Sequence, residues 1–263
     1  DAPGSWCAGE NWVRPATAED FMGRMVLLAQ TLPRMAGALA AAQPPAADAT
    51  ASVNARLVEE AAGAMRLSGL GSNAWALGSE RTENGRGLLL ANPHYPWYGG
   101  NRFWEKHLTI PGTLDVYGAH LLGAPGVAIG FNRGVAWSHT VSDSERVVLY
   151  KLDLVPGEPT RYFLDGEPRS MVSRTVTVPV LGEDGAVTDV ERRLWFSHLG
   201  PVLTMPGMPW TETMAFTARD ANARNTHLLS QWRAMNLATD LDAFIEAHRR
   251  WNAMPWVNTM AAS

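Results

Sequence analysis

Apolar residues along the chain follow two different periods, and the change falls at about a quarter of its length. Over residues 17–66 they recur three and four positions apart, which is typical of amphipathic helices. Thr17 is suited to cap the first helix, and Glu19 and Asp20 stand in its first turn. Pro33 predicts a kink or a split. The first part of the chain is therefore expected to be helical.

From Ser72 onward, short apolar runs alternate with polar positions and are separated by turn residues, which is typical of strands. Two such runs flank the turn 182–185 and predict a hairpin. Residues 217–236 and 240–251 predict two helices, although only the later part of the first is periodic, and residues 254–262 predict a last strand. Helices, then strands, then helices predict an α+β fold built in layers.

A stretch of small residues and prolines, "AAQPPAADATAS" at positions 41–52, interrupts the helical part. Such a composition is typical of an exposed linker. A second helix, "VNARLVEEAAGAMRL", follows it and leads directly to Gly69. We expect a connecting segment here, between the first helix and the strands.

Composition narrows the class of protein. Of the 263 residues 46% are apolar and 18% charged, with a formal net charge of −4, which is ordinary for a globular protein. The pI near 6.0 and the lack of a basic tract argue against nucleic-acid binding, and no run approaches the roughly 20 apolar residues of a membrane span. Eleven tryptophans predict large apolar pockets or a thick aromatic core.

The single cysteine, Cys7, excludes an internal disulfide framework and argues against a cysteine-based metal site. The first ten residues have neither the basic start nor the apolar core of a signal peptide. From the residues alone, the chain is either cytoplasmic or a mature or partial piece of an exported protein.

Gly71 and Ser72, in "GLGSNAW", precede the first strand and raise the question of chemistry. An ordinary turn explains them, and local sequence alone favours that interpretation. The motif G-x-S-x-G of α/β-hydrolases is not matched, and a chymotrypsin-like triad has no support beyond the presence of seven histidines. A third interpretation needs only Ser72: once the bond before it is cut, its own α-amine, of pKa about 7.7–8.0, can act as the base.

Three longer stretches change this balance: "GSNAWALGSERTENGRGLLLANPHYPW", "RFWEKHLTIPG" and "GFNRGVAWSHTV". In this order and spacing they resemble the penicillin acylase family of N-terminal-nucleophile (Ntn) hydrolases. Among its branches the chain is most similar to acyl-homoserine lactone acylases and aculeacin A acylase. The resemblance runs from about Ala55 to the last residue, and more weakly back to Trp12. It implies a four-layer αββα sandwich, incomplete in this chain and preceded by a helical segment.

Family members are exported precursors that cut themselves before the serine that opens the β subunit. Matched residue by residue, Ser72 is the implied nucleophile and base, and Gly71 the residue released by the cut. His94 stands at the position that holds the serine's amino group, usually through the backbone. Val141 stands at the residue whose backbone N–H forms half of the oxyanion hole. The family's second donor is an asparagine further along than this chain extends; Asn258 matches an earlier strand and is not that donor.

The resemblance also implies a substrate pocket with apolar walls, suited to a fatty or an aromatic acyl group. For each of its residues, ordinary hydrophobic core is an equally good interpretation. Asp143, Ser144 and Glu145 lie where penicillin G acylases bind calcium, but the pattern is not reproduced in register. We therefore expect no metal and no cofactor. The implied pocket residues are Tyr95, Leu121, Leu122, Val127, Trp137 and Trp256.

The resemblance predicts an amide hydrolase that removes an acyl chain from N-acyl-homoserine lactones or related N-acyl amides. It implies residues 1–43 as the end of an α subunit, 44–71 as a spacer, and 72–263 as the start of a β subunit, with a β excursion near 155–200. The implied partners are a small N-acyl substrate and the rest of both subunits, as a periplasmic or secreted heterodimer. This stretch alone is expected to be inactive. The alternatives are a β-lactam acylase and a non-catalytic homologue that acts as a binding module.

Overall fold

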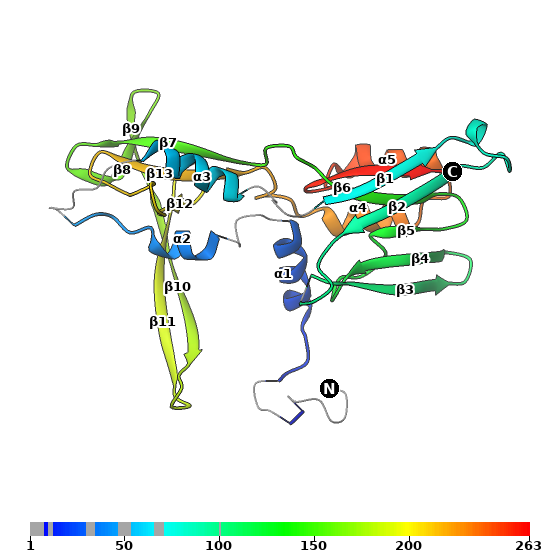
Figure 1. The fold of residues 1–263 in the computed structure, drawn as a ribbon. Helices are drawn as coiled ribbons and strands as arrows, with labels where there is room; N and C mark the ends of the chain where they lie inside the picture. Colours follow the sequence, from blue (N-terminus) through cyan, green and yellow to red (C-terminus); the bar gives the residue numbers. More distant parts are fainter. Residues whose placement is uncertain (1–7, 10–12, 30–34, 47–53, 66–70, 100) are drawn as a thin grey trace. The chain divides into compact units, whose positions relative to one another are not determined.

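The fold is taken from a computed structural model, which separates into two compact units by its internal contacts (Figure 1). The first unit contains Asp1–Ala29, Gly71–Thr140 and Asn225–Ser263, and the second contains Gln30–Leu70 and Val141–Arg224. Each unit is described by itself. The structure describes residues 8–9, 13–29, 35–46, 54–65, 71–99 and 101–263.

Three helices form in the predicted helical part: α1 (Ala18–Ala29), α2 (Ala36–Ala41) and α3 (Ala55–Met65). The start of α1 is a reciprocal cap. The Asp20 N–H donates to the Thr17 hydroxyl over 3.2 Å, and the Thr17 N–H donates to the Asp20 carboxylate over 2.8 Å. The predicted cap at Thr17 is thus confirmed, whereas Pro33, Cys7 and the later part of the linker lie outside the described residues.

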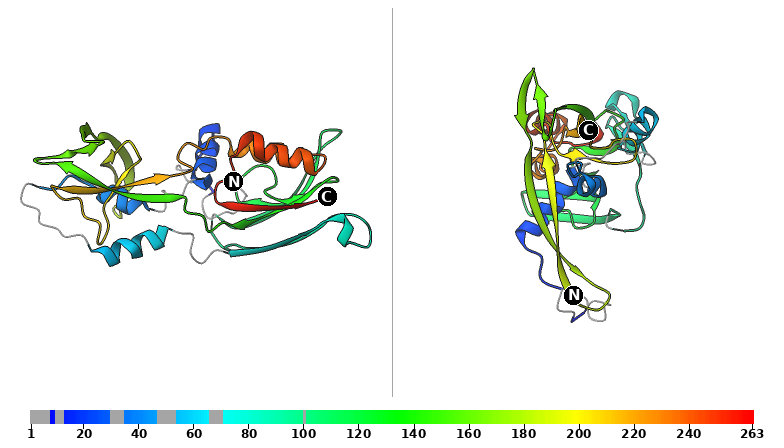
Figure 2. Two further views of the ribbon diagram at one scale, coloured as in Figure 1. Left: turned by 90° about the horizontal axis from the view of Figure 1, so that it is seen from above. Right: turned by 90° about the vertical axis from the view of Figure 1, so that its left-hand side faces the viewer.

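A five-stranded antiparallel sheet, in the order β14-β6-β5-β4-β3, is the centre of the first unit. Helices α4 and α5 lie on one side of it and a two-stranded hairpin on the other, so that the unit has helix, sheet and hairpin layers (Figure 2). The Asp240 carboxylate caps α5 by accepting a 2.8 Å hydrogen bond from Ala243 N–H. The elements are β3 (Phe103–Ile110), β4 (Leu114–Leu121), β5 (Ile129–Phe131), β6 (Ala136–Val141), α4 (Leu228–Asn236), α5 (Leu241–Trp251) and β14 (Val257–Ala262).

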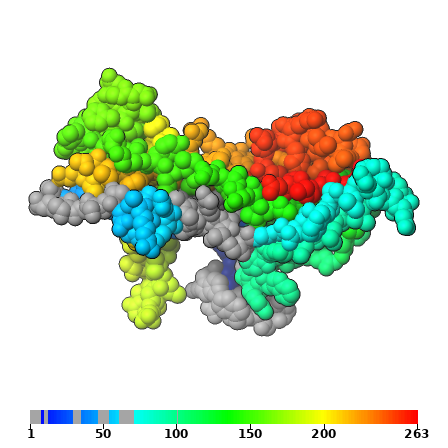
Figure 3. Space-filling model, turned by 45° about the horizontal axis from the view of Figure 1, so that its top comes forward, coloured from blue at the N-terminus to red at the C-terminus, as the bar shows by residue number. Residues whose placement is uncertain are grey.

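The hairpin of the first unit pairs β1 (Gly71–Leu77) with β2 (Leu88–His94) over seven residue pairs. It lies beside β14, as the neighbouring cyan and red segments of Figure 3 show. The Gly87 N–H donates to the Ser263 carbonyl over 2.7 Å and fastens the far end of the hairpin. One hairpin face carries four exposed apolar side chains: Trp75, Leu77, Leu88 and Leu90.

The second unit contains a sheet in the order β12-β13-β7-β8-β9 and a separate long hairpin of ten residue pairs. The hairpin turn falls at Gly182–Gly185, as predicted, with the Gly182 N–H donating to the Ala186 carbonyl over 2.8 Å. The elements are β7 (Val147–Val155), β8 (Glu158–Leu164), β9 (Glu167–Ser170), β10 (Val172–Leu181), β11 (Val187–Phe196), β12 (Val202–Leu203) and β13 (Met214–Asp220).

The predicted helix over 217–236 is wrong in its first part. Residues up to Asp220 belong to β13, and helix α4 begins only at Leu228. These residues form a strand because seven of them pair with β7, which satisfies their backbone hydrogen bonds. The same pairing buries the apolar side chains of Ala215, Phe216 and Ala218.

The α+β class predicted from the sequence is confirmed by these antiparallel sheets and few helices. In the part of the chain that the structure describes, no helix is both long enough and apolar enough to span a bilayer.

Candidate active site

Ser72 is the second residue of β1. The Ser72 hydroxyl donates a short hydrogen bond to the Gly71 carbonyl oxygen. It also accepts the backbone N–H of His94, with 3.4 Å between nitrogen and oxygen. The serine oxygen is therefore placed beside the carbonyl group of the preceding residue, and a backbone donor faces it.

The register of the hairpin produces this arrangement. Gly71 pairs with His94 and Ser72 with Pro93, so the ends of the two strands meet at the serine. A Cβ added at position 71 would lie 3.6 Å from His94 Nδ1, an ordinary van der Waals distance, so the imidazole lies directly beside this position. The structure thus brings together three of the predicted residues: Gly71, Ser72 and His94. The contact made by His94 is a backbone contact.

Val141 is the last residue of β6 and begins the later of the two segments of the second unit, Val141–Arg224. Its placement relative to Ser72, and hence its role as an oxyanion donor, stays a prediction. Asn258, on the neighbouring β14, donates from its side-chain amide to the Thr140 hydroxyl over 3.3 Å. This contact gives Asn258 a role between two strands.

Tyr95 and Trp256, predicted to line a substrate pocket, lie together in an aromatic cluster. Their rings are stacked, with centroids 6.1 Å apart. The Tyr95 ring also contacts the ring of Phe103, at the start of β3, with centroids 5.3 Å apart. The Trp256 indole N–H donates to the Leu28 carbonyl over 2.9 Å, which fixes that ring. Of the three residues in this cluster, Tyr95 directly follows His94 in the sequence.

The other predicted pocket residues lie in or near the hydrophobic core. Val127 and Trp137 are completely buried, Leu121 is nearly so, and Leu122 is more exposed. The Trp137 indole N–H donates to the Ala128 carbonyl over 2.6 Å. For these residues the structure displays core packing, and an additional role as pocket walls stays a prediction.

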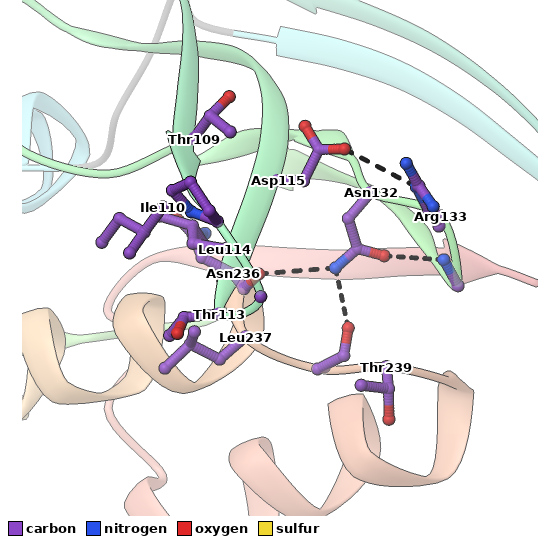
Figure 4. Close-up of a pocket in the computed structure, with 14 residues that line it drawn as sticks. Thr109, Ile110, Thr113, Leu114, Asp115, Asn132, Arg133, Asn236, Leu237 and Thr239 are labelled. Carbon is purple, nitrogen blue, oxygen red and sulfur yellow. Dashed lines mark hydrogen bonds and ion pairs between the residues drawn. The ribbon is translucent and has the colours of Figure 1, made fainter.

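A cleft of about 530 Å³ opens at the opposite end of β3 from Tyr95 (Figure 4). Ile110, the last residue of β3, lines the cleft, whereas Phe103, the first residue of β3, contacts Tyr95. The two residues are separated by about 23 Å along the strand. The floor is fixed by Asn132, whose amide donates to the Asn236 and Ala238 carbonyls over 3.4 and 2.7 Å. Sequence reasoning missed this cleft, which is made by three separate turns and carries no motif. None of the predicted site residues lines it.

One carboxylate at the cleft and two histidines in the core have shifted pKa values. The hydrogen bond from His107 lowers the pKa of Asp115, and the His107 and Arg133 charges add to this effect. Burial lowers the pKa of His120 and of His139 to about 3 each. Among the described residues, no three His, Cys, Asp or Glu side chains gather in a group that could hold a metal ion.

Comparisons with known proteins show the family to which the chain belongs. The sequence model of the penicillin amidase family matches residues 9–263. The chain is 47% identical to an acyl-homoserine lactone acylase PvdQ of Pseudomonas fluorescens (strain Pf0-1) over 260 residues, which are 97% of this chain and 33% of that protein. It is 41% identical to the aculeacin-A acylase of Actinoplanes utahensis over 262 residues, with the same coverage.

The chain therefore spans about a third of the length of the curated relatives it matches. In structure it is similar to a thermostable penicillin G acylase from Alcaligenes faecalis, with a TM-score of 0.57 and 23% identity over 66% of this chain and 30% of that one. The likeness confirms the fold predicted from the sequence. With the family model matched over nearly the whole chain, the protein belongs to the penicillin amidase family.

Proposed function

We propose that this chain carries the nucleophile of an acylase that removes the acyl chain from N-acyl-homoserine lactones or related N-acyl amides. One observation carries the proposal: Ser72 Oγ contacts the carbonyl of Gly71 and faces the His94 N–H, in a chain 47% identical to an enzyme named for this reaction. The relatives' names support the broader conclusion that the protein is an acylase acting on amides.

The proposed maturation step cuts the bond between Gly71 and Ser72. Ser72 Oγ attacks the Gly71 carbonyl carbon, its proton passes to the departing nitrogen, and the acyl group moves from nitrogen to oxygen. Water then hydrolyses the ester, which leaves a carboxylate on Gly71 and a free amine on Ser72. Glycine at position 71 supports this step, because it has no side chain to obstruct attack.

In the proposed turnover, the freed Ser72 amine takes the hydroxyl proton, directly or through one water. Oγ attacks the substrate amide, and the backbone N–H of Val141 stabilises the oxyanion together with an asparagine outside this chain. Such a donor contributes about 2.7–4 kcal/mol to transition-state stabilisation. The amine leaves, and water hydrolyses the acyl-serine. The His94 backbone N–H holds the serine end of the hairpin in place.

The proposed acyl pocket begins at the pair Tyr95 and Trp256. Their stacked rings offer an apolar surface, and each CH₂ buried there contributes about 0.8 kcal/mol. The remaining predicted walls, Leu121, Leu122, Val127 and Trp137, lie close to the same core. We further propose that the chain works as part of a processed periplasmic or secreted heterodimer, since the relatives are about three times as long.

The first experiment measures the intact mass of the complete gene product that contains this chain. We expect two polypeptides, separated between Gly71 and Ser72. Ser72→Ala should leave one uncut polypeptide, whereas Ser173→Ala, at the same second position of exposed strand β10, should be processed normally. An uncut native protein, or normal processing of Ser72→Ala, would refute the autocatalytic proposal.

The second experiment identifies the substrate. The processed protein is given acyl-homoserine lactones of increasing chain length, and penicillin G and a cephalosporin in parallel, with amine release as the readout. Preference for lactones supports the proposal, and preference for the β-lactams replaces it with a β-lactam acylase. Normal processing with no release from either class would indicate a homologue that binds without catalysis.

A further inference from the structure

A threonine hydroxyl joins two histidines from different elements next to the end of β6. His139 Nδ1, on β6, lies 3.0 Å from the Thr259 hydroxyl on β14. His248 Nε2, on α5, lies 3.4 Å from the same oxygen. The bridge therefore connects a strand, its neighbour in the sheet and the helix that covers both.

The second nitrogen of His248 determines how the protons are arranged. His248 Nδ1 lies 3.0 Å from the Phe244 carbonyl, which can only accept, so Nδ1 is the donor. In a neutral His248 ring, Nε2 then accepts, and the Thr259 hydroxyl donates to it. The Thr259 hydroxyl has one hydrogen, which is then used by His248, so His139 Nδ1 must donate to the hydroxyl oxygen. The hydroxyl therefore accepts from His139 and donates to His248.

His139 depends on this bridge because it is buried. Its exposed fraction is 7%, and burial, together with the neighbouring His248, lowers its pKa to about 3, so the ring is neutral near neutral pH. Its other nitrogen, Nε2, makes no hydrogen bond of normal geometry with a described residue, although the Ala128 backbone acts on the ring in the opposite direction and raises its pKa. A buried polar group left without any partner costs about 1–3 kcal/mol. Thr259 is therefore the side chain that holds this ring, through Nδ1.

The bridge ends two residues before Val141. Between them, Thr140 is joined to β14 by the Asn258 amide over 3.3 Å. Successive side chains of β6, on opposite faces of the strand, are thus both tied to β14. The Val141 N–H belongs to the peptide plane that begins at the Thr140 α-carbon, so fixing this strand end fixes the direction of that N–H.

We propose that His139, Thr259 and His248 are positioning residues that orient the Thr140–Val141 peptide for its work as an oxyanion donor. The inference rests on the proposed function and adds three residues to it. They touch neither the substrate nor the reacting atoms. Their effect is on the transition state, because an oxyanion donor shifted by a fraction of an ångström still permits substrate binding but stabilises charge less.

The test uses the processed, full-length protein and the best acyl substrate from the panel. Thr259→Val keeps the branched shape and removes the hydroxyl, while Thr259→Ser keeps the hydroxyl. We expect Thr259→Val to lower kcat about tenfold with KM within twofold, the signature of an interaction made only in the transition state. Thr259→Ser should restore most of kcat.

Ser138→Ala is the matched control. Ser138 is the buried β6 neighbour of His139, and its hydroxyl has no hydrogen-bond partner in the part of the chain that the structure describes. We expect wild-type kcat from this variant. His248→Leu removes the contact between His248 and Thr259 at a half-buried helix position and should lower kcat about threefold. This second variant tests the proposal if Thr259→Val does not fold.

The outcomes separate the two claims. Unchanged kcat in Thr259→Val and His248→Leu, with Ser72→Ala inactive, would overturn the positioning role and leave the proposed function standing. An equal loss of kcat in Ser138→Ala and Thr259→Val would also overturn it, because general loosening of β6 would then explain both. Full activity of Ser72→Ala would instead overturn the proposed function.

Discussion

The two ends of the first unit's sheet differ in what they offer a ligand. At one end, Ser72, the His94 N–H and the ring of Tyr95 gather reactive and apolar groups. At the other end, a cleft of about 530 Å³ is lined by turns, and its central amide, Asn132, is engaged with backbone groups. The candidate site and the cleft therefore lie in different places. The proposed chemistry rests on the residues that a strand end presents, and the size of the cleft does not point to it.

Among single substitutions, the largest effect on stability is expected at Gly118, on the strand β4 that connects the two ends. Its φ is +155°, and an added Cβ would lie 2.1 Å from the Ile129 carbonyl oxygen. Gly118→Ala should therefore lower the free energy of unfolding by about 3 kcal/mol, through overpacking and backbone strain together. Denaturant unfolding measures it.

Gly112, which lines the cleft, is the matched control. Its φ is +74°, but an added Cβ would have no neighbour within 4 Å. Gly112→Ala should cost only the left-handed backbone preference, about 1–2 kcal/mol. Equal losses at Gly112 and Gly118 would show that the close approach of β4 to β5 is unimportant.

Acid should also lower the free energy of unfolding of the first unit's sheet. His120 and His139 have folded pKa values of about 3, against about 6.5 in an unfolded chain. Below pH 6.5 the unfolded state binds more protons, so stability is full above that pH and is lost as the pH falls toward 3. The loss should be about 1.4 kcal/mol per pH unit for each histidine.

The neighbours Lys106, His139 and Arg24 lower the pKa of His120 further, and the neighbouring His248 does the same for His139. Hydrogen exchange of β4 and β6 amides at pH 7.5 and 5 tests the prediction. Protection that does not change between these pH values would contradict it.

The ring of Tyr95 should decide how well a long acyl chain binds. Tyr95→Ala removes a ring that covers about two CH₂ groups, so KM for a long-chain substrate should rise about tenfold. Tyr95→Phe keeps the ring and should stay near wild type. Thr113→Trp, which places a large side chain at the cleft, should leave KM unchanged. A higher KM in Thr113→Trp would reverse the comparison between the two ends.

The smallest effect is expected at the ion pair of the cleft. His107 Nε2 lies 2.7 Å from Asp115 Oδ1, and both side chains are about half exposed. Asp115→Asn should lower the unfolding midpoint only slightly at neutral pH, because solvent screens exposed pairs. The pKa of Asp115 is lowered, so this contribution is present at neutral pH and disappears as acid protonates the carboxylate. A large drop in the midpoint would show that the pair is structural.

Much of the fold could be predicted from local patterns, and the failures have a physical cause. The alternation after Ser72 predicts β1, and the turn at Gly182–Gly185 predicts the long hairpin. The stretch before α4 was predicted as helix, because nothing local reveals that it pairs with β7. Strand formation there depends on partners some 65 residues earlier, and sequence patterns cannot weigh such a pairing.

The candidate site shows the same limit. Gly71, Ser72 and His94 are identified through the family resemblance, and a local hairpin brings them together; their catalytic roles stay predictions. The bridge through Thr259 could not be predicted, because its members come from β6, α5 and β14 and carry no motif. The cleft is likewise made by turns that only the folded sheet brings together.

The hairpin register that pairs Gly71 with His94 and Ser72 with Pro93 has a consequence for the timing of the proposed maturation. Before the proposed cut, the nitrogen of residue 72 is an amide, whose lone pair is delocalised and accepts no proton near neutral pH. Under the proposed maturation, the general base would not exist until the hairpin had formed and the bond before Ser72 had been cut. Folding of β1 against β2 would then have to precede activity, and each molecule could be activated only once.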